Sequence, residues 1–169
     1  MVQMWYMDPS PCGDARLPHH CFPPKRITLE QLTNITGVNC CKVNMENTYL
    51  SNRQIKQVQK ERRLSHEETM EHTPDVNRDH NEMRKQEHDE AYLVVDGETY
   101  IDLKDERGKW IRVLVQKGDM LSVPARKEHR VCPTLKNIVV LRHFYNGGDD
   151  DAFEEYDETQ GDYEQNERI

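Results

Sequence analysis

Three side chains in the second half of the chain have the chemistry of a metal site. His88, Glu90 and His129 would supply two imidazoles and one carboxylate, and His143 stands further along the chain. Two histidines and one carboxylate are the ligand set of non-haem iron(II) sites that leave positions open for substrate and oxygen. The sequence contains eight histidines, and none of these spacings is as diagnostic as HExxH. The residue types alone therefore leave two interpretations open, a metal site and a set of surface groups.

A β-strand followed by a corner would bring these side chains together. Residues i and i+2 of a strand point to the same face, so His88 and Glu90 would project together into a barrel. Gly118 and Pro124 would turn the chain so that His129 lies on a facing strand.

The segment 88–145 is a series of short β-branched and aromatic runs separated by turn signals. We predict turns that join strands at 96–97, 106–109 and 118–119. Hairpin signals at this spacing predict an antiparallel barrel or sandwich. We therefore expect a mainly β fold of the α+β kind, in a single domain over residues 1–148.

The N-terminal part is predicted to pad this barrel. Thr28 begins a capping box and Gly37 closes a short helix. The segment 39–46 is a candidate strand, and the polar segment 51–72 predicts a surface helix with a narrow buried face. The proline-rich first 26 residues predict an irregular segment.

The acidity of the chain comes from its C-terminus. The net charge is -8, and residues 149–169 hold ten of the 31 acidic residues but one of the 23 basic residues. A like-charge block of this kind has too little apolar surface to offset the entropy of ordering, so we predict a disordered acidic tail. It is either a solubilising appendage or an interaction tail for a protein partner with basic groups.

Several classes of function are disfavoured. There is no apolar run of membrane-spanning length and no signal peptide, which predicts a soluble protein without a membrane partner. Nucleic acid is not an expected partner, because no basic stripe with interleaved aromatics occurs. The five cysteines form no CxxC pair and predict free thiols in a reducing compartment. We expect a monomer in the cytoplasm, with the nucleus as a further location.

Longer motifs resemble one known family. These are the opening "MVQMWYMD", the later "RLPH", the run "GETYIDLKDERGKWIRVLVQKGDMLSVPA" and the "HR" at 129–130. They resemble the acireductone dioxygenases, cupin enzymes of the methionine salvage pathway. The resemblance covers roughly residues 1–145. It implies a cupin-type double-stranded β-helix, or jelly-roll barrel, with its core at about 88–145.

The cupin motifs are matched in part. Gly118, Pro124 and His129 match the second motif, with Arg126 in place of its second glycine, and Glu90 matches the closing portion of the first motif. The resemblance thus implies that Glu90 and His129 stand at metal-ligand positions.

The front of the first motif departs from the family. The family's histidine pair would fall at Arg84 and Gln86. Arginine carries a fixed positive charge that repels a divalent cation, and glutamine offers only a weak carbonyl oxygen. Tyr92 stands where the family has an arginine, which puts recognition of an anionic enediol in doubt. Arg142 corresponds to a substrate-pocket position, after which the chain departs from the family's closing segment.

These departures lead to a preferred interpretation and two alternatives. We expect an inactive acireductone dioxygenase-like cupin without a cofactor, which acts as a structural or interaction protein through the barrel surface or the tail. The first alternative is an active dioxygenase that cleaves acireductone to a keto acid and formate, with Fe(II) or Ni(II) held by His88, Glu90 and His129. The second is a cupin that binds a small molecule without metal. A sandwich without a pocket also remains open.

Overall fold

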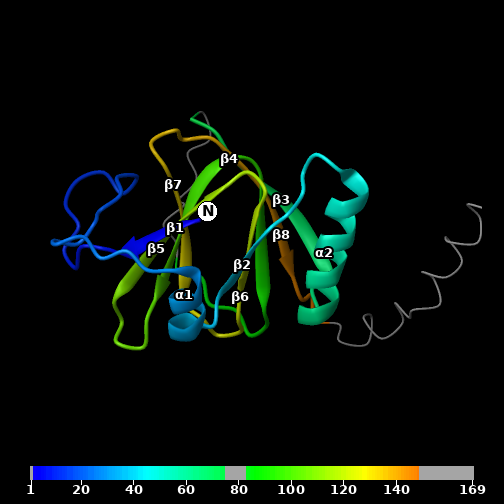
Figure 1. The fold of residues 1–169 in the computed structure, drawn as a ribbon, viewed down its shortest axis with the longest axis horizontal. Helices are drawn as coiled ribbons and strands as arrows, with labels where there is room; N and C mark the ends of the chain where they lie inside the picture. The colour runs from blue at the N-terminus through cyan, green and yellow to red at the C-terminus, as the bar shows by residue number, and fades with distance from the viewer. Residues whose placement is uncertain (1, 75–82, 149–169) are drawn as a thin grey trace, which may run out of the picture.

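A computed structural model describes residues 2–74 and 83–148. Its eight strands form one antiparallel sheet that curls into a barrel (Figure 1). The strands are β1 (Gln3–Tyr6), β2 (Asn39–Lys42), β3 (His66–His72), β4 (Glu90–Lys104), β5 (Trp110–Gln116), β6 (Asp119–Val123), β7 (His129–Pro133) and β8 (Val139–Tyr145). The predicted tail at 149–169 lies outside the described residues.

The long strand β4 belongs to both halves of the barrel. Its first half pairs with β6 and β8, and its second half pairs with β5 and β7. The register shifts between Val94 and Asp96, and Gly97 follows with a φ of +76°. The Asp-Gly signal therefore marks a bulge inside one strand, and the predicted hairpin at 96–97 is wrong. The predicted turn at 106–109 is confirmed, since it joins β4 to the antiparallel β5.

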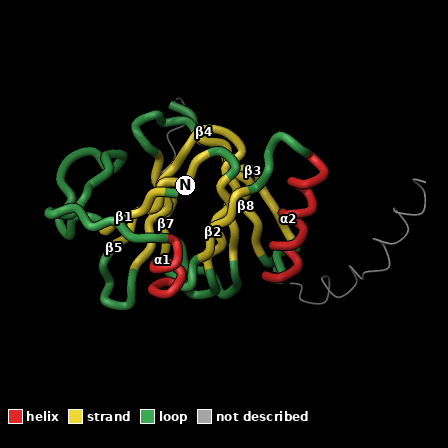
Figure 2. The backbone as a smooth tube through the Cα atoms, viewed as in Figure 1, coloured by secondary structure: helices red, strands yellow, loops and turns green. Residues whose placement is uncertain are grey.

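Two helices lie outside the barrel (Figure 2). The helix α1 (Leu29–Thr36) has the predicted capping box, because the Thr28 hydroxyl accepts from Gln31 and the Gln31 side chain accepts from the Thr28 backbone. The helix α2 (Thr48–Arg62) ends earlier than predicted, at a left-handed Arg63. The polar residues that follow form β3, which pairs with β8 along its whole length. Neither helix in the described part of the chain is long and apolar enough to cross a membrane.

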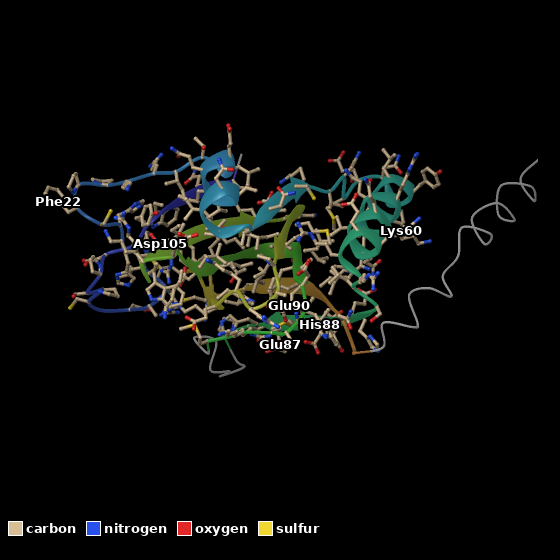
Figure 3. All side chains as sticks on the ribbon, turned by 90° about the horizontal axis from the view of Figure 1, so that it is seen from below. Phe22, Lys60, Glu87, His88, Glu90 and Asp105 are labelled. Atoms are coloured by element: carbon tan, nitrogen blue, oxygen red, sulfur yellow. The ribbon has the colours of Figure 1, made fainter. Side chains whose placement is uncertain are left out.

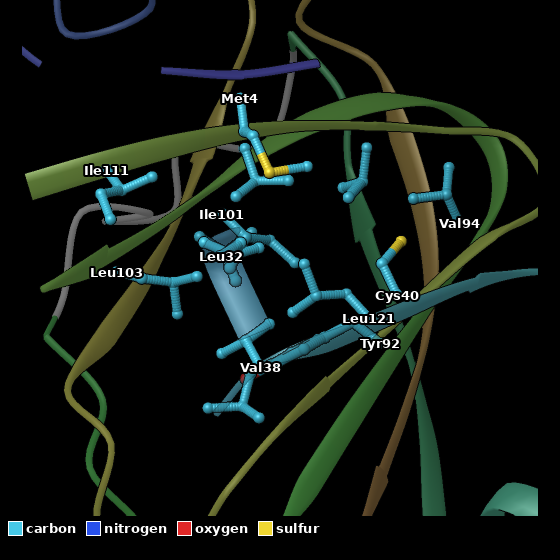
Figure 4. Close-up of a cluster of buried hydrophobic side chains, with 14 of the residues drawn as sticks. Met4, Leu32, Val38, Cys40, Tyr92, Val94, Ile101, Leu103, Ile111 and Leu121 are labelled. Atoms are coloured by element: carbon cyan, nitrogen blue, oxygen red, sulfur yellow. The ribbon is translucent and has the colours of Figure 1, made fainter. Parts of the chain in front are cut away.

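Alternation along β4 sends its side chains to two different layers. Tyr92 and Val94 point into the barrel and join its core, which Figure 4 shows with Met4, Leu32 and Ile101. Ala91 and Leu93 point outward and pack under α2 with Ile55 and Phe144. The interior of the barrel therefore lies on the face of Glu90 and Tyr92.

The N-terminal segment covers the opposite outer face of the barrel. Asp102 is fully buried there and accepts two hydrogen bonds from Arg112, at 2.8 and 2.9 Å. Arg112 also donates to the carbonyl oxygens of Ala15 and Leu17. This buried ion pair holds the irregular N-terminal segment on the sheet, and β1 within that segment was not predicted.

Candidate functional site

Glu90 is the centre of a buried polar cluster inside the barrel. Its side chain is 3% exposed. The oxygen Oε1 lies 3.0 Å from His143 Nε2, and Oε2 lies 3.1 Å from His129 Nε2. Burial raises the pKa of Glu90, but the hydrogen bonds and charges of the two histidines outweigh it and lower this pKa to about 2. The carboxylate is therefore ionised and satisfied by groups of the protein itself.

His129, at the start of β7, is held on both ring nitrogens. Nδ1 lies 3.0 Å from the carbonyl oxygen of Lys127, so it must donate. Nε2 lies 2.9 Å from the Tyr92 hydroxyl as well as 3.1 Å from Glu90. It either accepts from Tyr92 or, when protonated, donates to Glu90. In both states the lone pair that a metal would need is engaged.

His143 completes the cluster from β8, where the register places it opposite Tyr92. Its Nδ1 lies 2.9 Å from an oxygen of Glu68, and its Nε2 faces Glu90. Carboxylate oxygens only accept, so each ring nitrogen makes its contact as a donor when it carries a proton. The ring stacks on Tyr92, with centroids 4.7 Å apart, and on Tyr145 at 5.2 Å.

Sequence reasoning did not assign a role to His143 and missed Glu68. The alternation in the β8 run indicates an inward position for His143, which was a usable signal. Glu68 lay in a segment that was predicted to be helical, and only the pairing of β3 with β8 brings it to His143.

Tyr92 is buried at the centre of this network and links it to Arg84. Burial is the main cause that raises the pKa of Tyr92, and the Glu90 charge raises it further. The Arg84 guanidinium lies beside the tyrosine hydroxyl and lowers this pKa by its charge and by a hydrogen bond. A fixed positive charge therefore stands beside Tyr92, whose hydroxyl contacts both Glu90 and His129.

The segment before β4 is anchored to β7 by its backbone. Arg84 exchanges two backbone hydrogen bonds with His129, at 2.7 and 3.0 Å. The Gln86 side chain is exposed, and its backbone carbonyl oxygen accepts from the Arg126 backbone N–H. Arg84 and Gln86, the two positions where the family has its histidine pair, are therefore held at the mouth of the barrel.

His88 is exposed in a bend before the strand, because β4 begins at Glu90. The expectation that His88 and Glu90 occupy i and i+2 of one strand is therefore wrong, although Figure 3 shows them as neighbours. Arg142 lies on the outer face of β8, where it pairs with Glu67 at 2.9 Å. The structure thus brings together Glu90, His129 and Tyr92, and it leaves Arg142 outside.

A pocket of about 350 Å³ opens onto this cluster. Its lining residues are Glu68, Arg84, Gln86, His88, Asp89, Glu90, His143, Tyr145 and Asn146. A larger hollow, of about 600 Å³, lies between the N-terminal segment, α1 and the β4–β5 turn. The two hollows share no lining residue.

The side chains around Glu90 do not fit a divalent metal. Over residues 2–74 and 83–148, the structure holds no group of three or more His, Cys, Asp or Glu side chains that could hold a metal ion. Glu90 and His129 already satisfy each other, and Arg84 adds a repelling charge. The arrangement instead offers a charged, hydrogen-bonded pocket.

The curled antiparallel sheet with an inward-facing polar cluster defines a cupin barrel. The structure resembles that of "Acireductone dioxygenase from Bacillus anthracis with cadmium ion in active center", with a TM-score of 0.67 and 15% sequence identity. The likeness covers 86% of this chain and 92% of that one.

Residues 3–152 match the model of the ARD/ARD' family, and the chain belongs to that family. It is 38% identical to "Probable inactive acireductone dioxygenase 1" of Caenorhabditis elegans over 151 residues, which are 86% of this chain and 95% of that protein. It is 33% identical to "Acireductone dioxygenase" of Homo sapiens over 154 residues, 87% of this chain and 84% of that protein.

Proposed function

We propose that this chain is an acireductone dioxygenase family member without dioxygenase activity, in which a protein-only hydrogen-bond cluster stands in place of a metal centre. The observation that carries the proposal is the closed contact of Glu90 with His129 and His143, at 3.1 and 3.0 Å. These contacts engage the retained ligand positions with each other. The relatives named "Probable inactive acireductone dioxygenase" in two Caenorhabditis species support the same conclusion.

The two exchanged positions explain why activity would be lost. A divalent metal held by only Glu90 and His129 lacks the ligands that fix an open site. Arg84 then adds a charge of the wrong sign beside it. In place of a metal, His129 and His143 contact the carboxylate of Glu90, and Arg84 adds a fixed positive charge beside Tyr92. These contacts keep the inner carboxylate compensated.

The activity test is oxygen uptake with acireductone, in the presence of Fe(II) and separately of Ni(II). We expect no uptake above the protein-free rate. The matched variant carries Arg84→His and Gln86→His together, which restores the family's histidine pair on the same backbone. Uptake by the unchanged chain that disappears in His88→Ala would instead support the alternative site of His88, Glu90 and His129.

The role that remains is binding or assembly by the barrel and the tail. A protein partner for residues 149–169 or for the barrel surface would be detected by a loss of capture when the tail is removed. The five cysteines are free, which supports a cytoplasmic or nuclear location. Fractionation and size-exclusion chromatography would test the location and the monomeric state.

A further inference from the structure

Arg84 is a partly buried cation that has no carboxylate partner among residues 2–74 and 83–148. Its guanidinium forms no ion pair with a described residue, and it lies beside the Tyr92 hydroxyl. Other arginines nearby are paired, as Arg62 is with Asp89 at 3.3 Å and Arg142 with Glu67 at 2.9 Å. A guanidinium is always charged and has five donors in a rigid fork that matches a carboxylate. Arg84 therefore brings an anion-recognising group to the lining of the pocket.

Two carboxylates that line the pocket, Glu90 and Asp89, already have partners within the protein. Glu90 accepts from two histidines, and Asp89 accepts from Arg62 and from the backbone of Ala125. Their charges would not cancel the attraction of Arg84 for an incoming anion.

One acceptor of the pocket stays accessible. The Glu68 side chain is 52% exposed, and its oxygen Oε1 contacts His143. The exposed side chains of Gln86 and His88 add further hydrogen-bonding groups at the rim. The lining thus offers a fixed cation from one segment and a carboxylate acceptor from another.

We propose that this pocket binds a small carboxylic acid that carries a hydroxyl or amino group on the neighbouring carbon. Arg84 takes the carboxylate in a two-pronged contact, and Glu68 accepts from the hydroxyl or ammonium group. A volume of about 350 Å³ suits a small ligand of this kind. The inference rests on the proposed function, because it needs the pocket to be free of metal.

The test is calorimetric titration of the full chain, in EDTA, with lactate, L-alanine and acetate. We expect saturable binding of lactate or alanine that is at least tenfold tighter than that of acetate. Arg84→Gln should weaken it at least tenfold. Arg126→Gln is the matched control, since Arg126 is an exposed arginine that pairs with Glu87 and does not line the pocket. It should leave the affinity unchanged.

The two ligand types are separated by Glu68→Gln. If the natural ligand is an amino acid, this change weakens alanine more than lactate, because the ammonium loses its counter-charge. Tighter binding of lactate than of alanine to the unchanged chain identifies the hydroxy acid type. The proposal is overturned if none of the three acids binds, or if Arg84→Gln binds as well as the unchanged chain. If binding instead requires added Fe(II) or Ni(II), the metal-free proposed function itself fails.

Discussion

Replacing Glu90 with glutamine tests whether the cluster is held by its carboxylate. The change keeps the shape of the side chain but removes the charge that accepts from His129 and His143. Hydrogen bonds to charged groups contribute about 1.5–3 kcal/mol each. A glutamine retains one acceptor, so we expect a net loss of about 3 kcal/mol in the free energy of unfolding at pH 7.

The lowered pKa of Glu90 predicts a loss in the free energy of unfolding of the same size. The pKa falls from 4.5 to about 2 on folding, which corresponds to about 3 kcal/mol for a residue this buried. Because the folded-state pKa is the lower one, this stabilisation is complete above about pH 4.5 and disappears as the pH falls towards 2. Glutamine does not titrate, so the difference between the two proteins should shrink over that interval.

The assay is urea unfolding followed by circular dichroism, at pH 7 and at steps down to pH 2.5, with and without EDTA. Glu106→Gln, at an exposed turn position, is the matched control and should change stability by less than about 0.5 kcal/mol. A loss below about 1 kcal/mol at pH 7 would refute the reasoning. So would an EDTA effect as large as that of the substitution, because it would mean that a metal and not the histidines compensates Glu90.

Three further substitutions test how the barrel positions the cluster. Gly97→Ala should lower the free energy of unfolding by at least about 3 kcal/mol, since the new Cβ would overlap a backbone carbonyl. Gly108→Ala has a similar left-handed φ in open space and should lower it by about 1 kcal/mol. Thermal unfolding compares the two variants, and equal losses would contradict the bulge geometry. Asp102→Ala should lower the free energy of unfolding by about 3–5 kcal/mol, because Arg112 stays buried without its partner. Limited proteolysis should also cut the N-terminal segment faster in this variant. An unchanged cleavage rate would contradict the anchoring role. Thr28→Ala should remove about 1 kcal/mol by breaking the capping box of α1, and no change in the urea midpoint would mean that packing alone holds this helix.

Much of the fold could be predicted from local signals. The capping box at Thr28 and the turn at 106–109 are decided by nearby residues, and both are present in the structure. The Asp-Gly pair at 96–97 misled because partners on both sides extend β4 through it. The segment 66–72 is rich in helix-forming glutamate, yet pairing with β8 makes it a strand. Tertiary contacts overrode propensity at both places.

The site could be predicted in part. Motif spacing singled out Glu90 and His129, which the structure places 3.1 Å apart in the barrel interior. The spacing could not reveal that His143 faces Glu90, because these residues are 53 positions apart and meet through strand register alone. Glu68 is further concealed, as it reaches His143 only through the edge strand β3. The opposite error was made at His88. Its spacing from Glu90 favoured a shared strand face, but β4 begins only at Glu90, two residues after His88.

The most direct test of the central claim is the metal content of the purified, untagged chain. It would be measured by elemental mass spectrometry after reconstitution with Fe(II) and with Ni(II), beside His129→Ala as the control. A protein-only cluster predicts metal at background in both proteins. Near-stoichiometric metal in the unchanged chain that disappears in His129→Ala would contradict the account and restore the metal-dependent enzyme as the better interpretation.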